Sequence, residues 1–291
     1  MINRFLSFLK VIGNLSKAGI SISVALTTVT GYLLSTRQLD MSIIYPFMGV
    51  LFLAMSASTL NQLQERHTDK LMPRTQRRPL TNGSITVSTA IIVTLLAGLS
   101  GFLILYYYNG ALPAILGLMN LIWYNGVYTP LKYKTAFAAV PGGLVGAIPP
   151  VIGWVSGGGD IMHPSSIAMA GFFFIGQIPH FWLIILKYSN EYRLAGIKLI
   201  TDKFTIPQLR RLVFTWMLAT AFSGSIMTFI INIENNAIFL LMHLLSILLL
   251  VYSGIWLTKN NGNHSTRAFI IINLYYLLVM LCVFFDVILS N

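Results

Sequence analysis

Repeated apolar runs of about twenty residues limit the folds open to this chain more than any other feature. Such a run crosses the hydrocarbon core of a bilayer as one helix. Backbone groups in lipid must be paired internally, and uninterrupted apolar runs satisfy this as helices rather than as barrel strands. The sequence therefore predicts an all-α polytopic membrane protein, with residues 1–291 in a single domain. We read nine spans, at residues 18–36, 43–60, 84–106, 111–129, 136–155, 165–186, 211–232, 237–257 and 267–288.

The positions of the charges explain the net charge of +11 without a nucleic-acid partner. If the N-terminus is cytoplasmic, every Lys and Arg except Arg37 falls on the cytoplasmic side, as the positive-inside rule requires. The pattern predicts an integral protein of a bacterial cell membrane, with its active-site loops and N-terminus inside and its C-terminus outside. Residues 1–16 mix apolar and basic side chains, which suggests a helix lying at the membrane interface.

Polar groups crowd into residues 61–80, directly after the second predicted span. Asn61, Glu65 and Asp69 are spaced four residues apart, so a continuing helix would present them on one face over about 12 Å. Their oxygens suit a hard cation such as Mg2+, which binds carboxylates together with substrate phosphates. Arg74, Arg77 and Arg78 follow, and guanidinium groups match phosphate oxygens. The stretch predicts a metal–diphosphate site; the alternative is a solvated helix end with arginines that set topology.

A second polar cluster follows the sixth predicted span. Asn190 and Glu191 could complete the metal site, and Lys187, Arg193 and Lys198 could meet phosphate. By itself the cluster reads equally well as an ordinary basic loop.

The one cysteine, Cys282, excludes an internal disulfide and a cysteine-based metal cluster.

The motifs also carry a family resemblance. Asn61, Glu65 and Asp69, followed by Met72-x-Arg-Thr-x-x-Arg-Pro-Leu80, resemble the first signature of the UbiA superfamily of intramembrane prenyltransferases. Three further stretches resemble its heme o synthase (protoheme IX farnesyltransferase) branch. They are Tyr128-Thr-Pro-Leu-Lys132, the glycine- and proline-rich run from Gly142 to Trp154, and Pro179-His-Phe-Trp182 with the segment from Lys187 to Gly196.

This resemblance implies nine helices around a central cavity, with Mg2+ and prenyl diphosphate held at the cytoplasmic side. It implies farnesyl transfer from farnesyl diphosphate to a vinyl group of heme b, giving heme o for a downstream heme-modifying enzyme. Asn61, Glu65 and Asp69 would hold the metal, with Asn190 and Glu191 at the second motif. Arg74, Arg78 and Lys132 would neutralise the leaving diphosphate. In the family pattern an Asp is more usual at position 65, and an Asp pair at 190–191.

Aromatic side chains could shelter the allylic cation, each contributing about 0.5–2 kcal/mol. The candidates are Tyr124, Tyr128, Phe181 and Trp182, and His180 could contact the heme iron or a propionate. Packing alone explains each of these residues equally well. Two other functions stay open: prenylation of an aromatic quinone precursor, and a transporter or channel. A transporter predicts polar residues at mid-membrane in several spans, whereas here they crowd at one side.

Overall fold

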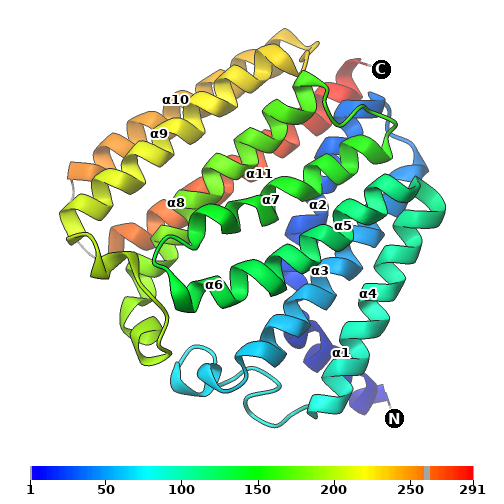
Figure 1. The fold of residues 1–291 in the computed structure, drawn as a ribbon. Coiled ribbons are helices and arrows are strands. Elements are labelled where there is room, and N and C mark those ends of the chain that lie inside the picture. The colour runs from blue at the N-terminus through cyan, green and yellow to red at the C-terminus, as the bar shows by residue number, and fades with distance from the viewer. Residues whose placement is uncertain (1, 259–262, 291) are drawn as a thin grey trace.

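The computed structural model describes residues 2–258 and 263–290, which form helices and connections without a strand (Figure 1). The α-helices are α1 (Ile2–Leu15), α2 (Ala18–Thr36), α3 (Ile44–Glu65), α4 (Val87–Asn109), α5 (Ala111–Ile122), α6 (Thr129–Lys134), α7 (Ala139–Ser156), α8 (Pro164–Leu194), α9 (Ile206–Ile230), α10 (Asn236–Thr258) and α11 (Asn263–Ser290). Short 3-10 helices, η1 (Met41–Ile43), η2 (Thr68–Leu71) and η4 (Ile200–Asp202), lie in the connections, and η3 (Trp123–Tyr128) is π-helical.

Eight helices in the described part of the chain are long and apolar enough to cross a membrane, which confirms the all-helical membrane architecture. They correspond to eight of the nine predicted spans. The fourth predicted span, 111–129, differs because the π-helical turn η3 divides its helical course into α5 and α6. Single π-helical turns are uncommon and often occur at functional sites.

The helices form a bundle in which α2 packs on α3, α7 and α11, and α8 packs on α7, α9 and α11 (Figure 1). The crossing of α2 and α7 brings two backbones into contact. A Cβ atom on Gly31 would collide with the carbonyl of Pro150, and one on Gly153 with the carbonyl of Thr28. Small residues permit this close approach, which supplies the packing that holds helices together in lipid.

A proline in α7 also helps to position α5 and η3, which replace the fourth predicted span, against α7. Pro149 has no N–H, so the carbonyl of Val145 lacks its intrahelical partner. Asn120 of α5 donates its Nδ2 to that carbonyl at 3.2 Å, and Trp123 donates Nε1 to the carbonyl of Pro141 at 2.8 Å. These two bonds fix η3 against the N-terminal half of α7.

The polar clusters differ from the sequence expectation in their secondary structure. Asn61 and Glu65 lie in the last turn and a half of α3, but Asp69 lies in η2, because the α-helix ends at Glu65. The predicted continuous helical face is therefore wrong for Asp69. Helix α8 continues beyond the predicted end at residue 186 to Leu194, with a break at Tyr188 (φ −118°, ψ 23°).

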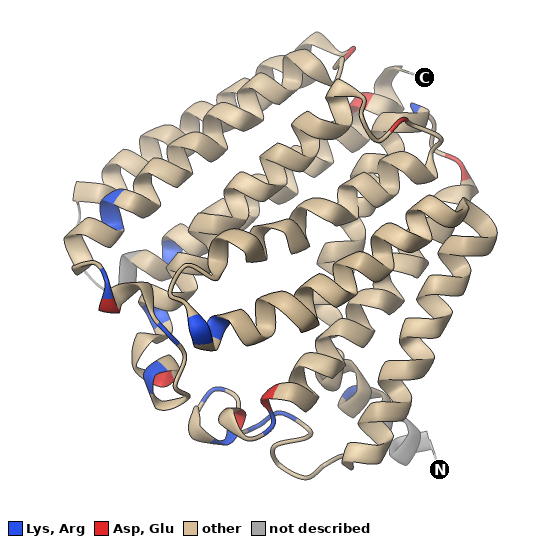
Figure 2. Ribbon diagram, in the orientation of Figure 1, with Lys and Arg blue, Asp and Glu red and all other residues tan. Residues whose placement is uncertain are grey.

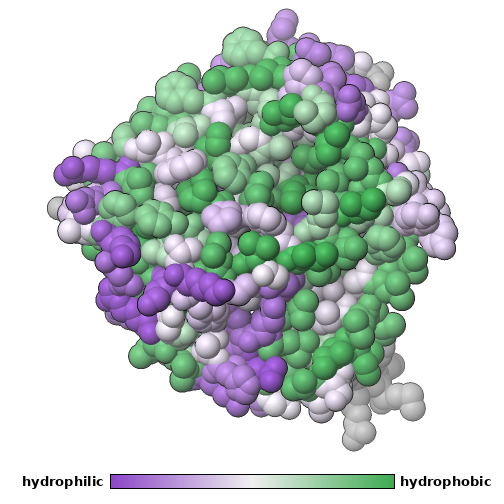
Figure 3. All heavy atoms as spheres, in the orientation of Figure 1, coloured by the Kyte–Doolittle hydropathy of each residue, from purple (hydrophilic) through white to green (hydrophobic). Residues whose placement is uncertain are grey.

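The surface is apolar along the middle of the bundle and more polar at its two ends, as expected of a membrane protein. Lys and Arg concentrate at one end of the bundle, around the connections that follow α3 and α8 (Figure 2). An apolar surface extends across the helices between the two more polar ends (Figure 3). On α4, for example, Leu95 and Leu96 are 65% and 61% exposed. So large an apolar surface on a monomer indicates contact with lipid. The N-terminal helix α1 and the end of α11 lie at opposite ends of the bundle (Figure 1).

Candidate active site

A cavity of about 190 Å³ lies at the basic end of the bundle. Its polar half is formed by α3, α6 and the connections that follow α3 and α8, and its apolar half by α7 and α8. The lining residues are Lys17, Asn61, Glu65, Met72, Arg74, Arg78, Tyr124, Tyr128, Lys132, Thr135, Ala136, Ala138, Ala139, Phe181, Ile184, Ile185, Tyr192, Ile197 and Lys198.

Two buried carboxylates at this site are each paired with a cation. Glu65 is 6% exposed, and its Oε1 accepts from Nζ of Lys132 at 2.6 Å and from the Tyr133 hydroxyl at 3.2 Å. Asp69 is 1% exposed, and both its oxygens accept from Nη1 of Arg78, at 2.7 and 2.6 Å. The same Nη1 lies 4.0 Å from Oε2 of Glu65. Since an unpaired buried charge is costly, these pairs hold the two carboxylates ionised in one place.

Asn61 contacts a cation that the sequence analysis did not identify. Its Nδ2 donates to the Thr129 hydroxyl at 3.3 Å, and its Oδ1 accepts from Nζ of Lys17 at 3.1 Å. Burial, and then the repulsion of Arg78, lowers the pKa of Lys17 to about 7, and an anion in the cavity would favour its protonated form. In the sequence Lys17 is simply the last basic residue before the first predicted span. No sequence pattern indicates that it contacts Asn61, which lies 44 positions further along the chain.

The predicted phosphate-binding cations divide into two groups. Arg74, Arg78, Lys132 and Lys198 line the cavity, and with Lys17 they make five cations against one lining acid, Glu65. The other three predicted cations do not line it: Arg77 is exposed, Lys187 lies over the Tyr188 ring, and Arg193 pairs with Asp202 at 2.9 Å on an exposed surface. The cavity is thus strongly biased toward an anion.

The structure brings together only part of the predicted metal site. Asn190 is exposed, and Glu191 accepts from the backbone N–H of Arg74 at 3.1 Å, so neither lines the cavity with Glu65. Within the described residues no three His, Cys, Asp or Glu side chains form a cluster able to hold a metal ion. The oxygens of Asn61, Glu65 and Asp69 nevertheless fit Mg2+, which usually takes one or two carboxylates and completes its coordination with substrate phosphates and water.

Tyr192 is another cavity residue that the sequence analysis missed. Its hydroxyl accepts from Nη2 of Arg74 at 3.4 Å, and the Arg74 guanidinium lies 4.8 Å from the centre of the Tyr188 ring. Together with the bond from the Arg74 N–H to Glu191, these contacts connect the loop after η2 to the end of α8. The second polar cluster therefore lines the cavity through Tyr192 and Lys198, while Glu191 holds the loop after η2 without lining the cavity.

Three of the five predicted pocket aromatics form one wall. The ring centres of Tyr124 and Tyr128 are 5.7 Å apart, those of Tyr128 and Phe181 are 5.4 Å apart, and Nζ of Lys132 lies 5.3 Å from the Tyr128 ring centre. This wall joins the cationic half of the cavity to its apolar half. Aromatic faces in such a position can stabilise a positive charge.

The structure does not place the predicted pocket residues His180 and Trp182 in the lining of this cavity. Successive residues of an α-helix point about 100° apart, so α8 cannot turn Phe181 and both its neighbours to the same side. His180 packs against Phe269 of α11 with ring centres 4.7 Å apart. Trp182 is 2% exposed and packs against Trp216 of α9. Both contribute to the contacts of α8 with other helices.

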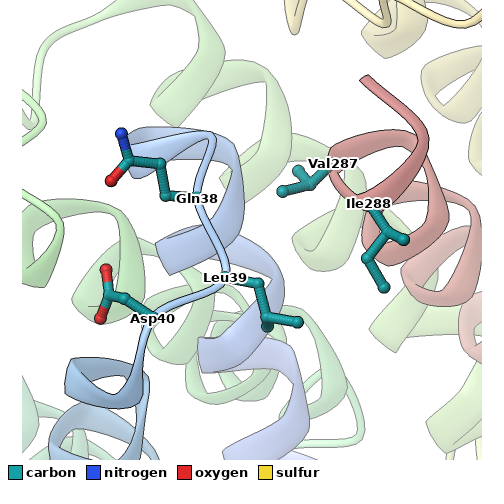
Figure 4. A pocket seen from close by; sticks show the side chains of 5 residues that line it. All are labelled: Gln38, Leu39, Asp40, Val287 and Ile288. Carbon is teal, nitrogen blue, oxygen red and sulfur yellow. The ribbon is translucent and has the colours of Figure 1, made fainter. Parts of the chain in front are cut away.

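A second cavity, of about 430 Å³, lies at the opposite end of the bundle. It is lined by Gln38, Leu39 and Asp40 from the connection between α2 and η1, and by Val287 and Ile288 of α11 (Figure 4). The side chains of Gln38 and Asp40 extend away from α11 in that view. None of the predicted site residues lines this cavity, so the candidate active site is the one at the basic end.

Comparison with known proteins agrees with this assignment of fold. The sequence profile of the UbiA prenyltransferase family matches residues 24–279. The protoheme IX farnesyltransferase of Cytophaga hutchinsonii is 38% identical over 205 residues, which cover 70% of each chain. That of Geobacter sulfurreducens is 44% identical over 153 residues, which cover 53% of this chain and only 56% of the relative.

A solved structure supports the same fold. The UbiA homolog of Archaeoglobus fulgidus bound to GPP and Mg2+ superposes with a TM-score of 0.65 at 16% identity, covering 94% of this chain and 99% of the other. Because the family profile spans residues 24–279, most of the sequence, the chain belongs to the UbiA prenyltransferase family.

Proposed function

We propose that the protein transfers a farnesyl group from farnesyl diphosphate to a vinyl group of heme b, giving heme o. One observation carries the reaction class: five cations and a buried, paired carboxylate line one half of a cavity whose other half is aromatic and aliphatic. An allylic diphosphate has two parts that match these halves: a polyanionic diphosphate for the cationic half and an apolar chain for the aromatic and aliphatic half. The acceptor rests on the relatives, which are named protoheme IX farnesyltransferases.

In this proposal each half of the cavity has its own task. Lys17, Arg74, Arg78, Lys132 and Lys198 bind the diphosphate and stabilise the charge that it gains when the allylic C–O bond breaks and the electron pair leaves with oxygen. Asn61, Glu65 and Asp69 would hold Mg2+, which supplies further positive charge to the leaving group when bound. The terminal carbon of the vinyl group then forms the new C–C bond with the allylic carbon. The cation left on the other vinyl carbon is captured by a water molecule that loses a proton, which gives the hydroxyl-bearing side chain of heme o.

The aromatic wall serves the other product of that bond cleavage. Tyr124, Tyr128 and Phe181 lie next to the cationic half, where they would flank the allylic cation. The aliphatic lining beyond them, including Ile184 and Ile185, excludes water that would otherwise quench the cation.

The resting ion pairs predict that metal and diphosphate bind interdependently. Diphosphate must draw Arg78 and Lys132 away from Asp69 and Glu65, which would leave two buried carboxylates without compensation. A divalent cation restores that compensation. Titration calorimetry with a non-ionising farnesyl thiodiphosphate should therefore show an affinity at least about 10-fold lower in EDTA than in Mg2+. Equal affinities in the two solutions would contradict the proposed metal residues.

Gly142 should be required for the position of the aromatic wall. A Cβ there would lie 2.6 Å from Cε2 of Tyr128 and 3.5 Å from the Phe181 ring, closer to the tyrosine than packed atoms allow. We expect Gly142→Ala to displace Tyr128 and to lower farnesyl transfer by about 10- to 100-fold. Gly171→Ala in α8 is the matched control, because nothing lies within 4 Å of its added Cβ. A wild-type rate in Gly142→Ala would exclude a positional role for Tyr128.

A deletion strain tests the acceptor. Loss of heme O and heme A with unchanged quinone levels supports heme b as the acceptor, and complementation with the intact gene should restore both hemes. Loss of a prenylated quinone with unchanged hemes would identify an aromatic quinone precursor instead.

The charge distribution supports an orientation in the membrane. We propose that the basic end in Figure 2 faces the cytoplasm of a bacterial cell, which puts α1 inside and the end of α11 outside. In the same proposal α1 lies at the membrane interface, the whole chain forms one domain, and heme o passes to a downstream heme-modifying enzyme. A reporter that is active only outside the cytoplasm, fused after Asn291, should be active.

A further inference from the structure

We propose that Gln62 is a positioning residue: it holds the corner between α1 and α2, and thereby keeps the ammonium group of Lys17 in the diphosphate cavity. This inference rests on the proposed function, because it assigns Lys17 to the diphosphate. Gln62 is 1% exposed and does not line the cavity, so it can act there only through another residue.

The corner that Gln62 contacts has an uncommon backbone. Helix α1 ends at Leu15 and α2 begins at Ala18, and Lys17 between them takes a left-handed conformation (φ 48°, ψ 52°). L-residues with side chains disfavour this conformation, so the surroundings must hold it in place. The conformation turns the chain sharply enough for Lys17 to extend its side chain to α3, where Nζ donates to Oδ1 of Asn61 at 3.1 Å.

Gln62 supplies that support through the carbonyls at the end of α1. Its Nε2 donates to the carbonyl of Leu15 at 2.7 Å and to that of Asn14 at 3.1 Å. The last carbonyls of a helix have no intrahelical partner, and the bond to Leu15 satisfies one of them. The carbonyl of Asn14 also accepts from the backbone N–H of Lys17 at 3.4 Å, so the bond from Gln62 reinforces the turn there. The two bonds from Gln62 also tie the backbone two and three residues before Lys17 to α3.

Two consecutive residues of α3 therefore hold the two ends of Lys17. Asn61 receives the ammonium group, and Gln62 holds the backbone from which the side chain starts. The corner is further fixed by Ser21, whose hydroxyl donates to the carbonyl of Ser16 at 2.9 Å, and by the packing of Leu15 on Leu63. In the described residues the two bonds from Gln62 are the only side-chain hydrogen bonds between α3 and the end of α1, so their loss should let the corner shift relative to Asn61.

A double-mutant cycle separates positioning from simple structural support. The variants are Gln62→Met, which keeps the length of the side chain but has no donor, Lys17→Met, and the two combined. The measurements are the Kd of farnesyl thiodiphosphate in Mg2+, by calorimetry, and the Tm of each purified protein. Contacting residues of one network show non-additive effects, whereas independent sites add.

We expect Gln62→Met to weaken binding about 10-fold and Lys17→Met to weaken it at least as much. The double variant should bind no more weakly than Lys17→Met alone, because Gln62 has no effect once the lysine is gone. Gln62→His, whose ring retains an N–H for the corner, should bind more tightly than Gln62→Met, and it replaces that variant in the cycle if Gln62→Met does not fold.

Two outcomes distinguish a failure of the positioning role from a failure of the proposed function. Additive losses in the double variant, with a wild-type protein that binds the ligand, would overturn the positioning role and leave the proposed function intact. A wild-type protein that does not bind farnesyl thiodiphosphate in Mg2+ would overturn the proposed function, and the positioning role with it.

Discussion

Replacing Asp69 with Asn is expected to lower farnesyl transfer by about 10³-fold, with the protein still inserted in the membrane. The substitution keeps the shape of a side chain that is 1% exposed but removes its charge. Two consequences follow for the proposed site: the metal loses a carboxylate ligand, and Arg78 loses the partner that holds it at 2.6 Å. Because Arg78 lines the cavity, its guanidinium can turn toward solvent there, so the fold should tolerate the change.

Asp202→Asn is the matched control for this variant. Asp202 also pairs with an arginine, at 2.9 Å, but the pair is exposed and neither residue lines the cavity. Rates of product formation in washed membranes, normalised to the amount of inserted protein, should be near wild type for Asp202→Asn. Full activity in Asp69→Asn would rule out Asp69 as a metal or diphosphate residue.

Replacing Lys132 with Met should lower transfer by about 100-fold. Lys132 donates to Glu65 at 2.6 Å, lies over the Tyr128 ring and lines the cavity, so it contacts both halves of the site. Methionine preserves the aliphatic stem, and the loss is therefore one of charge. It also leaves Glu65 without its closest cation, which adds a cost in stability of about 3–5 kcal/mol for a buried pair broken on one side.

Lys134→Met on the same short helix separates the local effect from a general loss of basic charge. Lys134 is exposed and absent from the cavity lining, so this variant should keep its activity and its Tm. If both lysine variants lost activity equally, the specific role of Lys132 would be refuted. If Lys132→Met lowered only the Tm, Lys132 would be a structural residue.

Apolar periodicity was sufficient to predict the helices, because lipid imposes length and composition on each span. The first span, 18–36, matches α2 residue for residue. The fourth span differs because Asn120 of α5 bonds to a carbonyl that Pro149 leaves free on α7, 25 positions further along the chain. Apolar periodicity carries no information about such a bond. Long apolar runs thus predict that a helix exists, but not where its hydrogen-bond pattern changes.

The site was predictable where its residues are neighbours in sequence and unpredictable where the fold brings them together. Asn61, Glu65 and Arg78 come from one polar stretch and share the cavity. Lys17 reaches it through a left-handed corner, which carries no sequence signal in a lysine. His180 and Trp182 lie outside the cavity lining because the rotation of α8 about its axis depends on its packing against α9 and α11, which the sequence does not give.

The central claim is that this cavity ionises farnesyl diphosphate and delivers the farnesyl group to heme b. The most direct measurement incubates membranes containing the protein with Mg2+, labelled farnesyl diphosphate and heme b, and identifies the labelled product by mass spectrometry. We expect label in heme o with release of diphosphate, and about 10³-fold less product from Asp69→Asn membranes. Label that remained in farnesyl diphosphate, or that appeared in a prenylated aromatic ring when hydroxybenzoate was supplied instead of heme b, would contradict it.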